Sequence, residues 1–242
     1  MRTISAAMPI NPSFLGKEQA LAGWQQCIWS HAVSDQMFEE CVRPALTVRH
    51  VPAGHYLWCN DDAPRGWVGV RRGAVKLCMP GEDGRSITLC GFAGSWFGEA
   101  CLLRQGARMD CDAVALHDLT MLTLAAPAFH RLRLESPAFS QFLLELMAER
   151  NQQLMRLISA QQCSHITSRV AQCLGALITP LNFPFPDAGQ LNITQSELAD
   201  FCRVSRSRFN EALLELERQD LLTVGYRSVQ LKDVERLRRY AT

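Results

Sequence analysis

Two helix starts close to the C-terminus constrain the fold of this chain more than any other feature of its sequence. Thr194 and Glu197 have the T-x-x-E spacing of a capping box, so a helix begins there. Ser205 is a second N-cap shortly afterwards, and the helix that it opens carries Phe209 and Leu213 on its inward face. Two short helices joined by a tight turn form a helix-turn-helix, which the sequence predicts here.

The second predicted helix carries side chains suited to reading DNA. In a helix-turn-helix the first turns of this helix enter the major groove. Arg206, Ser207 and Asn210 point away from the apolar face, so we predict that they contact base edges. An Arg pairs well with guanine and an Asn with adenine, and each good pair contributes about 1–3 kcal/mol of discrimination. The residues assigned to DNA phosphates are Thr194, Gln195, Arg203 and Arg208.

An alternative is that these arginines only solvate an exposed helix face. The segment LLTVGYRSVQL at 221–231 argues against it, because two β-prone runs around Gly225 are typical of the wing that trails many such motifs. The sequence therefore favours a winged helix-turn-helix, and we assign residues 163–242 to this DNA-binding domain.

Short β-prone runs separated by Gly, Pro and Asp fill residues 46–124. Evenly spaced strands of this kind are typical of an antiparallel barrel or jelly roll. The clearest hairpin joins AVKLCM to SITLCGF through the turn PGEDGR at residues 80–85. We assign residues 21–134 to a sensor barrel that begins with short amphipathic capping helices, and residues 1–20 to a poorly ordered arm.

One long helix is predicted over residues 135–162, where apolar residues recur at helical spacing. A stripe of such residues about 30 Å long has to be buried against something. The barrel can cover only its first turns, so the remainder is a candidate seam for a dimer; the alternative is an ordinary helix packed in a core. The stripe consists of Phe139, Leu143, Met147, Leu154 and Ile158.

The charge and cysteine content narrow the choice of function. The formal net charge is +1 with 20% charged residues, so DNA binding requires a local cluster of basic side chains. The 10 cysteines include no Cys-x-x-Cys pair, which favours free thiols, and no metal site is predicted. No signal peptide or membrane-spanning run is present, so we expect a cytoplasmic protein without membrane contact. No catalytic constellation stands out, so we do not expect an enzyme.

The order of these parts, from Leu21 to Leu231, resembles the Crp/Fnr family of bacterial transcription regulators. The segments that carry the resemblance are GAVKLCMPGEDGRSITLCGFAGSWFGEACLL, the long helix and ITQSELADFCRVSRSRFNEALLELE. The resemblance implies an α+β fold with an N-terminal cupin-like antiparallel β-barrel, a long dimerisation helix and a C-terminal winged helix-turn-helix. It also implies a homodimer that binds a palindromic double-stranded DNA site under the control of a signal sensed in the barrel. An activator of this kind would contact RNA polymerase.

The effector is where the sequence departs from that pattern. The run FGEACLL at 97–103 resembles the start of the phosphate-binding cassette of the cyclic-nucleotide-binding members, in which an Arg-Ser pair follows. Aligned without gaps, Met109 and Asp110 stand at the positions of that pair, and Arg108 lies one place early. A carboxylate repels a phosphate, and a slip of one residue on a strand turns a side chain to the other face, so the sequence disfavours a cyclic nucleotide. The candidate effector-pocket residues are Gly98, Glu99, Ala100, Arg108 and Asp110.

Other signals stay open. An iron–sulfur cluster of the kind that senses oxygen needs several cysteines, and only Cys27 and Cys41 precede the barrel. Thiol-based redox sensing depends on the pKa and exposure of a cysteine, which a sequence does not give. The sequence therefore leaves the cofactor unassigned, with haem or none as alternatives. The candidate haem ligands are His50, His55, His117, Cys78 and Cys101.

A second hypothesis, from another class, is a ligand- or redox-sensing module that acts through protein contacts rather than DNA. Its tail would lack exposed base-reading side chains, and the presence of Arg206 and Asn210 argues against it. The effector, the operator, the target genes and the sign of regulation do not follow from the sequence.

Overall fold

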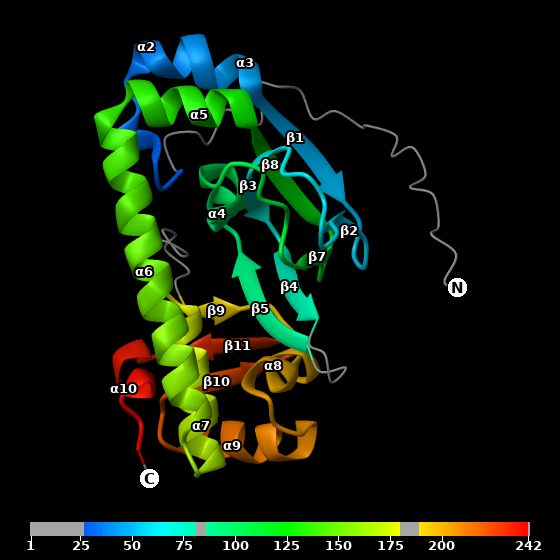
Figure 1. Cartoon of the computed structure of the whole chain (residues 1–242). Helices are drawn as coiled ribbons and strands as arrows, with labels where there is room; N and C mark the ends of the chain where they lie inside the picture. The colour runs from blue at the N-terminus through cyan, green and yellow to red at the C-terminus, as the bar shows by residue number, and fades with distance from the viewer. Residues whose placement is uncertain (1–26, 81–85, 180–188, 242) are drawn as a thin grey trace.

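The structure, a computed structural model, describes residues 27–80, 86–179 and 189–241. Three parts follow one another along the chain: a β-barrel, one long helix that runs beside the rest of the molecule, and a helical domain with a small sheet (Figure 1). The predicted α+β class is confirmed. The arm expected at residues 1–20 lies outside the described residues.

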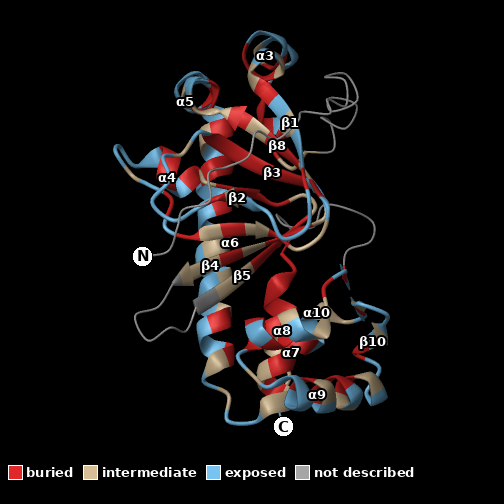
Figure 2. Cartoon of the chain, turned by 90° about the vertical axis from the view of Figure 1, so that its right-hand side faces the viewer, coloured by how far each residue is buried: buried red, intermediate tan, exposed pale blue. Residues whose placement is uncertain are grey.

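Two antiparallel sheets of four strands each form the barrel. Their strand orders are β1-β8-β3-β6 and β2-β7-β4-β5, so strands distant in sequence lie side by side, as in a jelly roll. Figure 2 shows β3 and β8 mostly buried at the centre of the barrel. The strands are β1 (Leu46–Val51), β2 (Tyr56–Trp58), β3 (Gly66–Arg72), β4 (Ala74–Pro80), β5 (Ser86–Phe92), β6 (Trp96–Phe97), β7 (Asp112–Ala115) and β8 (Leu119–Ala125).

The predicted hairpin joins β4 to β5. These strands pair in antiparallel register from Ala74 opposite Phe92 to Pro80 opposite Ser86. Residues 81–85 of the turn lie outside the described residues. The short helix α4 (Glu99–Leu103) follows β6 and precedes β7, on the segment where the sequence resembles a phosphate-binding cassette.

Short helical turns over residues 30–45 close one end of the barrel, and with α5 (Ala126–Glu135) they enclose a cluster of aromatic rings. The ring centroids of Trp67 and Trp96 lie 4.6 Å apart, and those of Trp29 and Trp67 lie 5.1 Å apart. Phe139 of the long helix belongs to the same cluster, so this cluster anchors the start of that helix on the barrel. The turns are η2 (Ser30–Ala32), α2 (Asp35–Met37), the π-helical η3 (Phe38–Val42) and α3 (Arg43–Ala45).

The long helix is α6 (Pro137–Gln161), and it begins at Ser136, whose hydroxyl oxygen accepts a hydrogen bond from Phe139 N at 3.2 Å. Its two faces differ in burial: Phe139 and Leu143 of the predicted stripe pack against the barrel, as expected for the first turns. Neither α6 nor any other helix of the described segments is long and apolar enough to cross a membrane. The exposed members of the predicted stripe are Met147, Leu154 and Ile158.

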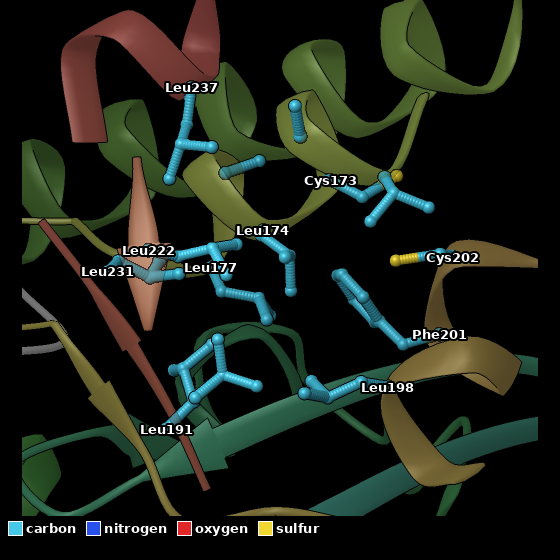
Figure 3. Packing of buried hydrophobic residues seen from close by; sticks show 14 of the residues in the cluster. Cys173, Leu174, Leu177, Leu191, Leu198, Phe201, Cys202, Leu222, Leu231 and Leu237 are labelled. Atoms are coloured by element: carbon cyan, nitrogen blue, oxygen red, sulfur yellow. The ribbon is translucent and has the colours of Figure 1, made fainter. Parts of the chain in front are cut away.

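The C-terminal domain packs four helices against a three-stranded antiparallel sheet of order β10-β11-β9. Its core is drawn in Figure 3, where Leu198, Phe201 and Cys202 lie opposite Cys173, Leu174 and Leu177. The sequence missed β9, which is two residues long and gains its stability only from pairing with β11. The elements are α7 (Ile166–Leu177), β9 (Gln190–Leu191), α8 (Gln195–Cys202), α9 (Arg206–Arg218), β10 (Leu222–Gly225), β11 (Ser228–Leu231) and α10 (Val234–Arg238).

The C-terminal domain rests on the barrel through α8. Cys90 of β5 belongs to the same apolar cluster as Leu198 and Phe201 of α8. Nε2 of His117, which lies just before β8, is 2.6 Å from the carbonyl oxygen of Asn192. This contact leaves α9 at the end of the molecule away from the barrel (Figure 1).

Candidate DNA-binding surface and sensor site

The predicted capping box at the start of α8 is present. The Thr194 hydroxyl accepts from Glu197 N at 3.3 Å, and Thr194 N donates to Glu197 Oε2 at 3.0 Å. Because two of the free amides at this end are paired reciprocally, the first turn of α8 is stabilised. Gln195 begins the helix, so Thr194 and Gln195, both assigned to phosphate contacts, lie at its N-terminus.

A single residue in the left-handed conformation makes the turn between the two helices. Arg203 has a φ of 55° and ends α8, with its amide donating to Asp200 O at 3.1 Å. Ser205 then caps α9 by accepting from Arg208 N at 3.4 Å. The turn is therefore as tight as the sequence predicted, although an Arg occupies a conformation that costs an L-residue about 1–2 kcal/mol.

The base-reading candidates lie at the start of α9 and differ in exposure. Arg206 and Ser207 are exposed, and Ser207 Oγ lies 3.3 Å from Glu211 Oε1. Asn210 is half-buried, and its Oδ1 is buried without a hydrogen-bond partner among the described residues. Asn210 therefore lies at the edge of the apolar face of α9, and reading a base requires its carboxamide to turn outward.

Basic side chains concentrate around this turn. Arg203, Arg206 and Arg208 are all exposed within six positions of one another, in a chain whose formal net charge is only +1. Such a local cluster is what binding to phosphate requires when the whole molecule carries almost no charge. Figure 2 shows exposed residues recurring along α9 at this end of the domain.

In the barrel, Glu99 is a buried charge with two partners. It is 1% exposed, its Oε1 lies 2.8 Å from Arg150 Nη1, and its Oε2 accepts from Trp67 Nε1 at 3.0 Å. Both carboxylate oxygens are thus occupied by the protein itself. The Glu99 side chain points to the long helix, and its contact with an effector stays a prediction.

Arg150 makes two further contacts with the barrel. It donates to Trp96 O, and its guanidinium carbon lies 5.2 Å from the centre of the Phe97 ring. The Phe97 ring occupies the space beside Gly91, where an added Cβ would lie only 2.1 Å from the ring. Gly91 is therefore required for Phe97 to lie under the arginine.

The other candidate effector residues do not converge on a phosphate site. Arg108 is 60% exposed and pairs with Asp61 through a hydrogen bond of 2.9 Å to its carbonyl oxygen, while Met109 is buried in the barrel core. Gly98 has a φ of 95° and makes the turn before α4, and Ala100 and Asp110 are exposed. Arg108 lies in a loop before β7 rather than on a strand, so the expected slip between strand faces does not arise, and its guanidinium contacts Asp61.

Comparisons with known proteins match both halves of the chain. Residues 48–136 match the family described as "Cyclic nucleotide-binding domain", and residues 168–240 match "Crp-like helix-turn-helix domain". The chain belongs to the Crp/Fnr family of transcription regulators. It is accordingly a DNA-binding transcription regulator with an N-terminal effector-sensing domain, and not an enzyme.

Characterised Crp/Fnr relatives cover much of the chain. It is 27% identical over 160 residues to "cAMP-activated global transcriptional regulator CRP" of Pasteurella multocida, covering 65% of this chain and 77% of that protein. It is 25% identical over 196 residues to "CRP-like cAMP-activated global transcriptional regulator" of Mycobacterium tuberculosis, covering 78% of this chain and 86% of that protein. The FixK2 structure from Bradyrhizobium japonicum has the same fold, with a TM-score of 0.65 at 18% identity over 80% of this chain and 96% of that one.

The tip of the wing carries two exposed side chains that the sequence did not assign to a site. Tyr226 is 94% exposed, and Arg227 beside it is exposed with a φ of 53°. They connect β10 to β11 next to α9. The signal that could have singled them out is their place in the sequence, because a Tyr and an Arg form the two-residue turn between the β-prone runs of the wing.

The thiols and histidines are not arranged as a metal site. Among the described residues no group of three or more His, Cys, Asp or Glu side chains could hold a metal ion. Burial raises the pKa of Cys27 and of Cys111 to about 11, and that of Cys90 to about 12. These three thiols therefore stay protonated at neutral pH and are poor nucleophiles.

Cys173 differs from these thiols. A hydrogen bond with Cys202 lowers the pKa of the Cys173 thiol, although both side chains are buried. The candidate haem ligands are scattered: Cys101 Sγ donates to Arg108 O at 3.3 Å, and His50 Nδ1 lies 3.1 Å from Thr120 Oγ1.

Proposed function

We propose that two copies of the chain pair along α6 and bind a palindromic DNA site as a homodimer. One α9 would enter each of two major grooves that lie about 34 Å apart on one face of the duplex. The observation that carries this proposal is an exposed apolar stripe on the outer face of α6, called here the α6 seam. Its members are Leu144, Met147, Leu154 and Ile158, with the polar Asn151 at its centre.

The spacing of the α6 seam supports pairing with an identical helix. With Asn151 included, successive positions are alternately three and four residues apart, which is the a/d repeat of a coiled coil. Leu144 is 66% exposed and Ile158 is 57% exposed, which is high for large apolar side chains on a helix. A second copy offers the same seam by two-fold symmetry and would cover it.

At the DNA, we propose that Arg206 and Ser207 read base edges, with Asn210 after it turns outward. Side chains that flank the turn and begin α8 contact the DNA phosphates. Such contacts fix the register of the protein on the duplex without reading its sequence. These side chains are Thr194, Gln195, Arg203 and Arg208. The dimer acts in the cytoplasm and, where it activates, touches RNA polymerase.

Control by the barrel is proposed to pass through the ion pair between Glu99 and Arg150. Arg150 lies one residue before Asn151 of the α6 seam, so a change at α4 moves a side chain of the pairing helix directly. The effector contacts predicted for Gly98, Ala100, Arg108 and Asp110 stay part of this proposal, on the segment that carries Glu99.

The test pairs a seam variant with a matched surface variant. Leu144→Glu with Ile158→Glu places two carboxylates on each seam, and like charges across a dimer interface repel. We expect a monomer in sedimentation and loss of binding to a palindromic duplex that the wild-type chain selects from a random pool. Leu134→Glu, at an α5 residue that is 72% exposed, leaves both unchanged. A dimeric seam variant with full DNA affinity would contradict the proposal.

A further inference from the structure

We propose that the chain takes up a compact, uncharged, apolar small molecule in a pocket where the barrel, α6 and the DNA-binding domain meet. The proposal rests on the proposed function in one respect, that the barrel controls DNA binding. The pocket has a volume of about 100 Å³. None of the candidate effector residues near α4 lines it, but the pocket adjoins that segment, because Phe97 lines it and Arg150 of its wall pairs with Glu99.

The walls of this junction pocket come from all three parts of the chain. Strands β4 to β6 supply Leu77 and Phe97, α6 supplies Leu157, and the DNA-binding domain supplies Leu177 of α7 and Phe201 of α8. All but two of the lining residues are apolar. An apolar ligand gains by leaving water for such walls at about 25 cal/mol for each Å² that it buries.

The two polar residues in the lining already have partners. Arg150 is neutralised by Glu99, and Gln153 Nε2 donates to Ala176 O at 2.9 Å. Nε of Arg150 is buried and has no acceptor among the described residues. The pocket therefore offers no net charge to a phosphate or carboxylate and few polar groups, which selects an uncharged ligand.

The volume of the pocket also excludes a nucleotide and favours a small ligand. Sites for drug-sized ligands are usually about 300–1,000 Å³, whereas an apolar cavity of about 150 Å³ stays dry and admits benzene. A volume of about 100 Å³ therefore suits a ligand near the size of one small ring rather than a nucleotide. Leu154 lines the pocket and is 44% exposed, so the mouth lies next to the α6 seam.

The position of the pocket gives its occupant a way to control DNA binding. A molecule that contacts Leu89 of the barrel, Leu157 of α6 and Phe201 of α8 together favours the arrangement in which the DNA-binding domain rests on the barrel. A ligand that binds one arrangement better than another shifts the population toward it, and the effect on DNA is equal and reciprocal. The occupant is therefore an effector as well as a ligand.

The experiment uses the full chain, with toluene as the probe and cyclic AMP as the charged comparison. At about five times its Kd, toluene should raise Tm by about 2–4 °C in a saturable way, and cyclic AMP should not. Cys90 lines the pocket, so Cys90→Leu fills it and should abolish the rise. The matched control is Cys78→Leu on the neighbouring strand, which does not line the pocket and should keep the rise.

DNA affinity is measured beside Tm on the selected palindromic duplex, with and without toluene. A change of at least about threefold that Cys90→Leu removes would support the proposal. An unchanged Tm in the wild-type chain, an equal rise in Cys90→Leu, or a rise with cyclic AMP alone would overturn it. If the chain binds DNA but does not respond to toluene, the ligand proposal is wrong and the proposed function stands. If the chain responds to toluene but does not bind DNA, the proposed function is wrong and ligand binding in the pocket stands.

Discussion

Glu99 and Arg150 form a buried ion pair in which Oε1 and Nη1 are 2.8 Å apart, and it joins α4 of the barrel to the middle of the long helix. The carboxylate is 1% exposed and the arginine side chain 25% exposed, so water screens the pair poorly. Trp67 satisfies the second carboxylate oxygen. The pair thus fixes the distance between the sensor and the helix that we propose to be the dimer axis.

Removing one partner of this pair should lower the free energy of unfolding. Arg150→Met leaves Glu99 as an uncompensated buried charge, and such a change destabilises a protein by about 3–5 kcal/mol. Combining it with Glu99→Gln removes the charge and keeps an acceptor for Trp67, so we expect a smaller loss. The free energy of unfolding from urea titration measures both. A single variant that costs less than the double variant would show that the charge is not what matters.

Truncating Arg206 and truncating Arg208 should have different effects on DNA affinity. Arg206→Ala should weaken binding to the selected palindrome by about 1–3 kcal/mol per half-site with little effect on random duplex. Arg208→Ala should weaken both and reduce the salt dependence by about one unit per lost phosphate contact. Gel-shift titrations at two salt concentrations separate them. Arg104→Ala, at an exposed barrel residue, is the control, and equal losses for both helix variants would show the roles to be wrongly assigned.

The local signals in the sequence were sufficient for the helix-turn-helix. The capping pairs at Thr194 and Ser205 act over three residues, so reading them needs no knowledge of the rest of the fold. The same holds for the strands of the barrel, whose turn residues and β-prone runs are adjacent. Local propensity also placed the long helix, because its apolar period continues without a break to Gln161.

The sensor site could not be predicted in the same way. Glu99 and Arg150 are far apart in sequence, and no rule of spacing pairs a carboxylate after a strand with an arginine in a later helix. The sequence therefore gave no indication that Arg150 and Trp67 are partners of Glu99. The left-handed conformation at Arg203 was also not predictable, because the residue that usually indicates such a position is Gly and here it is Arg. The burial of Asn210 Oδ1 depends on neighbours packed from elsewhere in the domain.

Arg203→Gly should separate stability from DNA binding. Glycine adopts the left-handed conformation without the penalty of an L-residue, and its own extra freedom in the unfolded chain offsets part of that gain. We expect the free energy of unfolding to rise by up to about 1 kcal/mol and DNA affinity to fall, since a basic group beside the turn is lost. Arg203→Lys keeps the charge and the strained conformation and should change neither by much. A loss of stability in the Gly variant would contradict this account.

The buried thiol of Cys90 should make the protein sensitive to alkali. Burial raises its pKa from 9.0 to about 12, so the folded state keeps a proton that the unfolded chain loses. Its contribution to stability is therefore complete below pH 9 and falls as pH rises toward 12, by about 1.4 kcal/mol per pH unit. Urea titrations between pH 8 and about 10.5 should give a shallower decline for Cys90→Ala than for wild type. Cys59→Ala, at an exposed thiol, should keep a slope closer to that of wild type.

Asn151 lies at the centre of the α6 seam, between Met147 and Leu154, and we expect it to set the register of the pair. A polar residue at one a position of a coiled coil lowers stability but specifies register and the number of strands. Asn151→Leu should therefore tighten self-association by about tenfold in sedimentation equilibrium while adding higher oligomers. Shifted registers displace the two α9 helices, so affinity for the palindrome should fall even as association tightens. Gln152→Leu, one residue away and outside the seam, should do neither. A tighter Asn151→Leu dimer of one size with unchanged DNA affinity would show that the register is set by the apolar residues alone.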